Sequence, residues 1–203
     1  MLHNIEAISG VILAGGKSSR MGTDKGLLKL GQYSVIERIA GVLRTMVDEI
    51  VIITNRPGRY AKYGDKIIND YIHWLGPLGG IHAGLVHATH PWVLVTACDM
   101  PFISAPVARL MMHCAANCDV VVPRHRGYAE PLYALYNKSC LEVIEQHLYQ
   151  GQGKITLLYD KLRVRYVEDA EMSLAEPHLE QAFANLNTPK DLMEAQTWTA
   201  EIS

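Results

Sequence analysis

Apolar residues along this chain occur in two patterns, short uninterrupted runs and longer segments in which they recur every three or four positions. A run such as VILA at 11–14, with no polar alternation, is typical of a strand that is buried on both faces. Such runs predict strands at about 8–14, 49–54, 66–69, 92–98, 119–123, 131–136 and 163–167. The periodic segments predict helices at about 33–47, 77–89, 104–117, 138–149, 154–161 and 188–197.

The order of these segments predicts the fold class. Strands that alternate with helices favour an α/β fold in which right-handed crossovers place helices on both faces of a mainly parallel sheet. Two helix starts carry local signals, because Ser104 before Pro106 and Thr188 before Pro189 each offer a cap and a preset φ. We therefore expect a three-layer sandwich built on a doubly wound sheet.

The first predicted strand runs into a loop that is rich in glycine and positive charge, AGGKSSRMGTDKG at 14–26. Its glycines allow positive φ values and close approach of a ligand to the backbone, while Lys17, Arg20 and Lys25 surround the turn with positive charge. Exposed amides and cations together suit an oligophosphate. A basic surface loop that only joins a strand to a helix is the alternative interpretation.

Two named phosphate-binding motifs do not match this loop. A Walker A loop needs two glycines separated by four residues before Lys-Ser, and Gly10 lies one position too far from Gly16. The dinucleotide fingerprint needs a third glycine, and none follows Gly15 and Gly16 at the correct spacing. A P-loop protein and a Rossmann dehydrogenase are therefore both disfavoured.

Polar residues follow the next three predicted strands, where ligands of open α/β sheets bind. These residues are Asn55, Asp70 and Asp99. Asp99 ends the apolar run WVLVTACD and would present a carboxylate that can hold Mg²⁺ beside a phosphate. It can also be interpreted as a cap for the helix near Ser104, and Asn55 and Asp70 as plain turn residues.

The run GPLGG at 76–80 opens a predicted helix, with Pro77 at its start. A plain helix entry explains the proline. The further glycines lower helix stability, which indicates that something flat, such as a base, packs against this backbone.

Composition limits the classes of function. With 203 residues the chain is long enough for one sizeable core, and a net charge of −2 with a pI near 6.5 disfavours nucleic-acid and membrane-surface binders. No apolar stretch approaches a membrane span, and the start MLHNIEAISG is too polar for a signal peptide, so a cytoplasmic location is expected.

The four cysteines are expected to be reduced. Cys114 and Cys118 beside His113 could form half of a zinc site, but structural thiols are favoured.

With these residues assembled, the chain resembles the nucleotidyltransferases that begin with LxGG or LAxG, and more narrowly the MobA-like molybdenum cofactor guanylyltransferases. The motifs that carry the resemblance span nearly the whole chain in order: LAGGKSSRMGTDKG at 13–26, TNR at 54–56, IND at 68–70, GPLGG at 76–80, CDMPF at 98–102, EPLYALY at 130–136 and NLNTPKDL at 185–192.

The resemblance implies a Rossmann-like nucleotidyltransferase fold that transfers GMP from GTP to the terminal phosphate of molybdopterin, with Mg²⁺, and releases pyrophosphate. It implies a single domain over 1–203, with a nucleotide-binding part at about 1–100 and an acceptor part at about 101–203. The substrate phosphate is itself the nucleophile in such a reaction, so the protein supplies positioning and charge.

The resemblance also implies roles for single residues. The backbone of Leu13, Ala14 and Gly15 would meet the nucleotide, Lys25 its phosphates, and Asn55 and Asp70 the nucleoside. Asp99 would bind Mg²⁺, and Asn185 and Asn187 would face the pterin. Electrostatics adds Arg20 and Lys17, which would hold the leaving pyrophosphate.

Two other functions stay open at this point. A cytidylyltransferase acting on molybdopterin or on a sugar or polyol phosphate is similar in sequence, but Gly15 and the GPLGG run favour a purine. A nucleotide-binding regulator without chemistry would tolerate loss of the metal carboxylate. Delivery of a fragile cofactor also implies transient docking to molybdoenzymes or to other proteins of cofactor biosynthesis.

Overall fold

The computed structural model describes residue 5 and residues 7–15, 24–69 and 76–201. Within these ranges one sheet has the order β10-β7-β9-β6-β1-β4-β5, and β8 pairs with β7. The strands are β1 Ile8–Leu13, β4 Glu49–Ile53, β5 Lys66–Ile68, β6 Trp92–Ala97, β7 Val120–His125, β8 Tyr128–Ala129, β9 Tyr133–Asn137 and β10 Val164–Glu168. A separate hairpin contains β2 Lys29–Leu30 and β3 Tyr33–Ser34.

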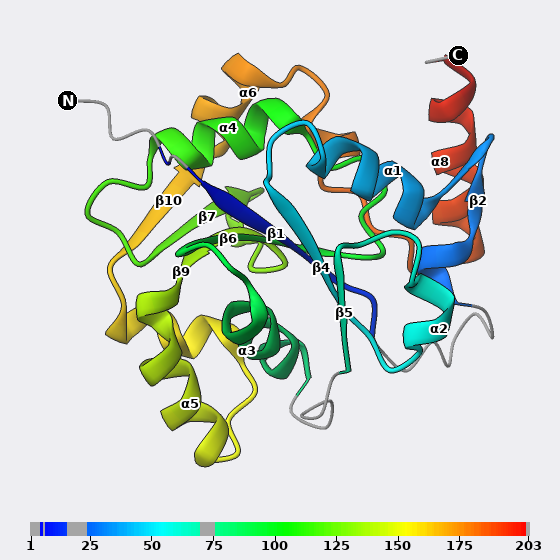
Figure 1. Cartoon of the computed structure of the whole chain (residues 1–203). Coiled ribbons are helices and arrows are strands. Elements are labelled where there is room, and N and C mark those ends of the chain that lie inside the picture. The colour runs from blue at the N-terminus through cyan, green and yellow to red at the C-terminus, as the bar shows by residue number, and fades with distance from the viewer. Residues whose placement is uncertain (1–4, 6, 16–23, 70–75, 202–203) are drawn as a thin grey trace.

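Helices cover both faces of this sheet. They are α1 Val35–Leu43, α2 Pro57–Tyr60, α3 Pro77–His87, α4 Ala105–His113, α5 Leu141–Tyr149, α6 Asp169–Ala175, α7 Leu179–Ala182 and α8 Pro189–Glu201, with 3₁₀ turns η1 Lys25–Leu27, η3 Lys138–Cys140 and η4 Ile155–Lys161. In Figure 1, α3 and α5 lie below the sheet and α1, α4 and α6 lie above it. The predicted three-layer α/β sandwich is confirmed.

The strand directions bring several strand ends to one edge. Strand β1 pairs in parallel with β4 and β6, and β4 pairs in parallel with β5. Strand β9 runs antiparallel to both β6 and β7, so β7 points the same way as β6. The carboxyl ends of β1, β4, β6 and β7 therefore lie at the same edge, and β9 begins there.

The seven predicted strands are all present, while three two-residue strands, β2, β3 and β8, were not predicted. Such strands are too short to carry a periodic pattern. The helix predicted at 33–47 is shorter at both ends. β3 occupies its first two residues, and after Leu43 the chain continues in tight turns. Helix α8 begins as predicted: the Asp191 amide donates to Thr188 Oγ1 and the Thr188 amide to Asp191 Oδ2, so the two ends of the first turn cap each other.

Strand β1 is the centre of the core, and all six of its residues are buried. Ile12 packs into the cluster on the α1 and α4 side, whereas Val11 and Leu13 pack toward α3. Helix α3 approaches β1 closely at two glycines: a Cβ on Gly84 would lie 2.7 Å from Val11 Cγ1, and one on Gly80 would lie 3.1 Å from Leu13 Cδ2. Thus Gly80, which was expected to meet a flat ligand, packs against a strand side chain instead.

We expect Gly84→Ala to destabilise the protein by about 1–3 kcal/mol, because the added methyl overlaps a β-branched side chain in a tightly packed layer. The measurement is the free energy of unfolding by urea. Gly41→Ala is the matched control, since Gly41 lies in α1 and a Cβ there would meet nothing within 4 Å. That substitution should stabilise the helix by about 0.5–1 kcal/mol. Equal effects of both changes would contradict the packing argument.

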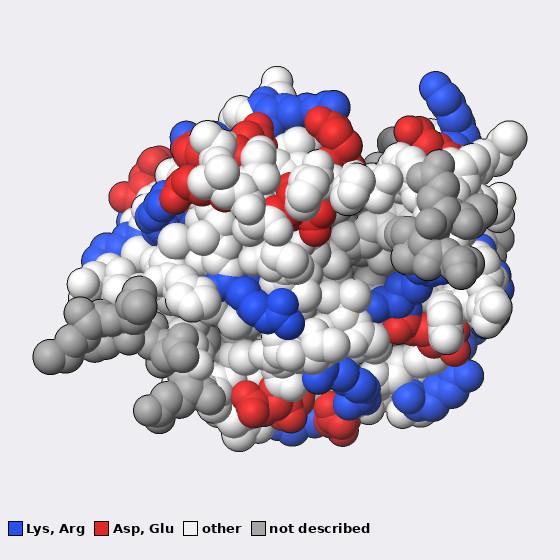
Figure 2. Space-filling model, turned by 90° about the horizontal axis from the view of Figure 1, so that it is seen from above, with Lys and Arg blue, Asp and Glu red and all other residues white. Residues whose placement is uncertain are grey.

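The surface carries charges of both signs. Figure 2 shows Lys and Arg side chains interspersed with Asp and Glu over the face seen from above. Such mixing is typical of a solvated face. No helix within the described ranges has the length and apolar character needed to span a membrane.

Candidate active site

Three polar side chains from distant parts of the chain meet at the carboxyl edge of the sheet. Lys25 Nζ donates to Asn187 Oδ1 at 2.8 Å and lies 3.4 Å from Asp99 Oδ2. Lys25 begins η1, Asp99 follows β6, and Asn187 precedes α8. The side chains of Lys25 and Asp99 are 20% and 26% exposed, so both are partly shielded and still accessible to a ligand.

Asp99 is held by backbone hydrogen bonds on both sides. The amide of Cys98 donates to the Leu13 carbonyl at 3.1 Å, which joins the end of β6 to the end of β1. The Asp99 carbonyl accepts from the Leu186 amide at 2.8 Å. The cap of α4 is Ser104, whose hydroxyl accepts from the Val107 amide, so the alternative role of Asp99 as that cap is excluded.

The end of β1 turns outward at Gly15. The Ala14 amide donates to the Ile53 carbonyl at 2.8 Å, and the Ala14 carbonyl accepts from Thr54 Oγ1 at 2.9 Å. Leu13 and Ala14 are buried, and Gly15 is exposed. The amide of Ala14 is therefore already used inside the sheet, and Gly15 is the first residue after β1 that is open to a ligand. Asn55 is also exposed, two residues after the end of β4.

A second charged cluster fixes the turn that carries Lys25. Asp24 accepts from the Tyr60 hydroxyl and lies 3.3 Å from Arg56 Nη1. Burial and the neighbouring Asp24 raise the pKa of Tyr60 well above its usual value, which keeps the phenol a donor. A Cβ on Gly26 would lie 2.7 Å from the Tyr60 oxygen, so only glycine fits beside this ring.

The predictions from sequence did not include Asp24 or Tyr60. A partial signal was present, because Asp24 directly precedes Lys25 in the sequence TDKG. The partner Tyr60 lies 36 positions away, however, and no local pattern identifies it.

Cys98 lies beside Asp99 but is not suited to nucleophilic chemistry. Burial and the Asp99 carboxylate raise the pKa of Cys98 to about 12. The thiol is therefore protonated near neutral pH, whereas the thiolate is the reactive and metal-binding form.

Asp99 offers a divalent cation a carboxylate at this place, whereas the nearby Asp24 carboxylate is engaged by Tyr60 and Arg56. Within the described ranges, no group of three or more His, Cys, Asp or Glu side chains is arranged to hold a metal ion. This donor set suits Mg²⁺, which is usually held by one or two carboxylates together with substrate phosphates and water, and it does not suit a closed zinc site.

A family model for the MobA-like NTP transferase domain matches residues 10–166. The chain belongs to this family. A probable molybdenum cofactor guanylyltransferase of Pelotomaculum thermopropionicum is 43% identical over 93% of this chain and 91% of its own length. A molybdenum cofactor guanylyltransferase of Desulfosudis oleivorans is 37% identical over 95% of this chain and 96% of its own length.

Among solved structures, the molybdopterin-guanine dinucleotide biosynthesis protein A of Archaeoglobus fulgidus is 28% identical and superposes with a TM-score of 0.81. The match covers 95% of this chain and 99% of that one. The recognition made from the sequence motifs is thereby confirmed, and the chain is a nucleotidyltransferase. Membership in the family also indicates that a divalent metal takes part.

Three of the predicted site residues of this nucleotidyltransferase, Lys17, Arg20 and Asp70, lie outside the described residues. Their roles remain predictions. The structure brings Lys25, Asp99 and Asn187 together and leaves Asn55 exposed near the same edge. Asn185 is partly buried, and its side-chain amide donates to the Phe183 carbonyl at 3.3 Å.

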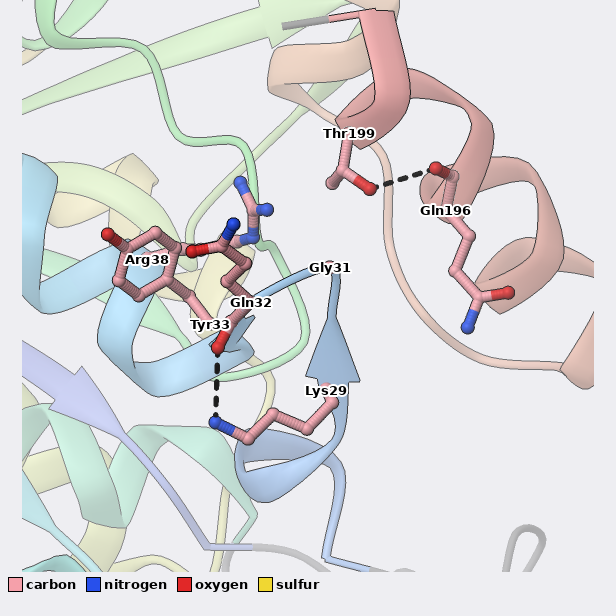
Figure 3. Close-up of a pocket in the computed structure, with 7 residues that line it drawn as sticks. All are labelled: Lys29, Gly31, Gln32, Tyr33, Arg38, Gln196 and Thr199. Carbon is pink, nitrogen blue, oxygen red and sulfur yellow. Dashed lines mark hydrogen bonds between the residues drawn. The ribbon is translucent and has the colours of Figure 1, made fainter. Parts of the chain in front are cut away.

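A cavity of about 730 Å³ lies apart from these residues, between the β2–β3 hairpin and α8 (Figure 3). Within the hairpin, Lys29 Nζ donates to the Gln32 carbonyl, as Figure 3 shows, and Arg38 donates two hydrogen bonds to the Leu30 carbonyl. Its lining contains no carboxylate for a metal and none of the predicted site residues, so it is not the candidate active site. The lining residues are Lys29, Gly31, Gln32, Tyr33, Arg38, Gln196 and Thr199.

Proposed function

We propose that this nucleotidyltransferase transfers GMP from GTP to the terminal phosphate of molybdopterin, forming the guanine dinucleotide cofactor and pyrophosphate. The contact of Lys25 with Asp99 and Asn187 at the carboxyl edge of the sheet carries the proposal, because it joins a cation for phosphate to a carboxylate for a metal. The names of the full-length relatives support the same reaction.

The reaction needs no nucleophile from the protein. A phosphate oxygen of the acceptor attacks the α-phosphorus of GTP, a new P–O bond forms, and the bond from the α-phosphorus to the bridging oxygen breaks. The electron pair of that bond leaves with pyrophosphate. Lys25 would exchange its long 3.4 Å contact with Asp99 for the triphosphate oxygens, where its charge offsets the negative charge that develops. Asn187 would keep the Lys25 ammonium directed at them.

Asp99 would hold Mg²⁺, and Asp70 is proposed at the nucleoside end together with Asn55. When bound, Mg²⁺ neutralises phosphate charge and polarises the phosphoryl group. When Lys25 leaves Asp99 to bind the phosphates, the Asp99 carboxylate oxygen becomes free to bind the cation. Binding of the nucleotide would therefore strengthen binding of the metal, and the reverse. Gly15 would meet the nucleotide through its backbone. Leu13 and Ala14 are buried and their backbone groups bond within the sheet, so they would support Gly15 from below and not contact the nucleotide as expected from the sequence. Arg20 and Lys17 would meet the leaving pyrophosphate.

The acceptor part is proposed to begin after Asp99, with Asn185 and Asn187 on its side of the site, so the two halves of a single domain serve the two substrates. The four free cysteines fit a reducing compartment such as the cytoplasm. Transient docking to molybdoenzymes follows from the need to deliver the product.

The test is turnover by the purified protein with molybdopterin, Mg²⁺ and each nucleoside triphosphate in turn. We expect pyrophosphate release with GTP and a much slower reaction with CTP, ATP and UTP. A preference for CTP would support the cytidylyltransferase instead. Tight GTP binding without pyrophosphate release would support the regulator.

A further inference from the structure

The segment around Glu130 lies beside the strand end that carries Asp99. The Ala97 amide donates to the Leu132 carbonyl at 3.0 Å, and Thr96 pairs with Tyr133 in the antiparallel ladder of β6 and β9. Glu130 is two residues before Leu132, and Asp99 is two residues after Ala97. Both residues are therefore at the same edge of the sheet, and Glu130 lies on the side of β6 that faces away from β1.

The β7–β8 hairpin presents Glu130 from a rigid base. Arg126 and Gly127 both have positive φ, as the two central residues of a type I′ turn require. The Glu130 amide donates to the Pro123 carbonyl at 2.9 Å, which continues the pairing of β7 and β8. Arg124 and His125 pair with Ala129 and Tyr128, so His125 is the diagonal neighbour of Glu130 on one face of the hairpin.

A segment that we call the strap, residues 183–187, links this hairpin to the active site. The ring of Phe183 stacks on His125 with centroids 4.8 Å apart and an interplanar angle of 17°. Further along the strap, the Leu186 amide donates to Asp99 and Asn187 accepts from Lys25. The hairpin and the metal-binding end are thus fixed to each other through a chain of direct contacts.

The other carboxylates near the hairpin are engaged by partners. Asp169 lies 2.8 Å from His125 Nδ1 and also accepts from the Arg126 amide. Glu180 pairs with Arg126, and Glu168 lies 2.9 Å from Arg124 Nη1.

Glu130 differs from its neighbours. Within the described ranges no hydrogen bond or ion pair reaches its carboxylate, although the residue is partly buried. Burial raises the pKa of Glu130, with His125 acting in the opposite direction. A partly buried carboxylate without a partner has lost hydrogen bonds to water. A ligand that donates hydrogen bonds to it can replace them, and this would stabilise the carboxylate.

We infer that the Glu130 carboxylate binds the amino-pyrimidinone edge of the pterin and determines specificity for the acceptor. This inference rests on the proposed function. A pterin presents its 2-amino group and the adjacent ring N–H as two parallel donors, and a carboxylate offers two acceptor oxygens in matching geometry. The ring is held at Glu130 while the terminal phosphate at the other end of the acceptor reaches Asp99, and the strap keeps the two ends in register.

The first experiment is steady-state kinetics of Glu130→Gln. The amide replaces one acceptor oxygen by a donor that faces the pterin donors. The KM for molybdopterin should rise about 10-fold or more, which is the effect expected when a good bidentate contact is lost. The KM for GTP and kcat should stay within about twofold of their wild-type values. Glu142→Gln, at an exposed position on α5, is the matched control and should leave all three constants unchanged.

The second experiment begins with the wild-type protein and does not depend on the folding of a variant. Binding of 6-hydroxymethylpterin and of the corresponding lumazine, which has a carbonyl oxygen in place of the 2-amino group, is measured by fluorescence titration. The wild-type protein should bind the pterin about 10-fold more tightly. In Glu130→Gln this preference should disappear.

The outcomes separate the two proposals. Wild-type turnover with GTP and molybdopterin, combined with equal binding of pterin and lumazine or an unchanged KM in Glu130→Gln, overturns the role of Glu130 alone. Failure of the wild-type protein to turn over molybdopterin with any nucleotide overturns the proposed function, and the role of Glu130 with it.

Discussion

Asp99→Asn is expected to lower turnover by about 10²-fold or more, because one preorganised electrostatic partner of a phosphoryl transfer typically contributes that much. The amide keeps the shape of the side chain and removes the charge that would hold the cation. The fold should survive, since the Asp99 backbone carbonyl, which accepts from Leu186, is not changed. The measurement is pyrophosphate release over a range of Mg²⁺ concentrations, where the variant should also need more Mg²⁺.

Asp160→Asn is the control for this experiment. Asp160 is exposed at η4 on the α5 side of the sheet, so its loss should leave turnover unchanged. Normal turnover in Asp99→Asn would remove the carboxylate from the mechanism and leave the protein as a nucleotide binder at most.

The fold was predictable from the sequence where burial of a segment leaves a pattern of apolar residues in that segment. Strand β1 contributes residues to the clusters on both faces of the sheet, so its second half is apolar without interruption, and this pattern was readable in VILA. The position of Asp99 was predictable for a related reason, because the end of an apolar strand is also the end at which α/β sheets bind ligands.

The contacts between distant segments were not predictable from such patterns. Asn187 lies against Lys25 across 162 positions, and Asp24 meets Tyr60 across 36. Gly80 of α3 was misjudged for the same reason: its closest neighbour is the Leu13 side chain of β1, and a sequence pattern names no partner. Glu130 was visible only as part of the EPLYALY motif, whereas its lack of an internal partner required the surrounding side chains to be placed.

Lys25→Ala should lower turnover by about 10²-fold or more and should also weaken GTP binding. Loss of a residue that acts only in the transition state would lower kcat and leave GTP binding unchanged. Two contacts are lost together, the one to Asn187 and the one to Asp99. Lys25→Arg should rescue the activity poorly, because the planar guanidinium has a different shape and donor geometry from the compact ammonium that fits beside Asn187.

The two quantities to measure are kcat and the dissociation constant for GTP, the latter by titration without acceptor. Lys161→Ala, at the end of η4, is the control and should change neither. A loss of GTP affinity with unchanged kcat would mean that Lys25 binds the ground state and the transition state equally. Arg20 or Lys17 would then be the residue that stabilises the charge of the transition state. If both quantities stayed at their wild-type values, the phosphates would have to bind elsewhere, and the contact of Lys25 with Asp99 and Asn187 would be structural.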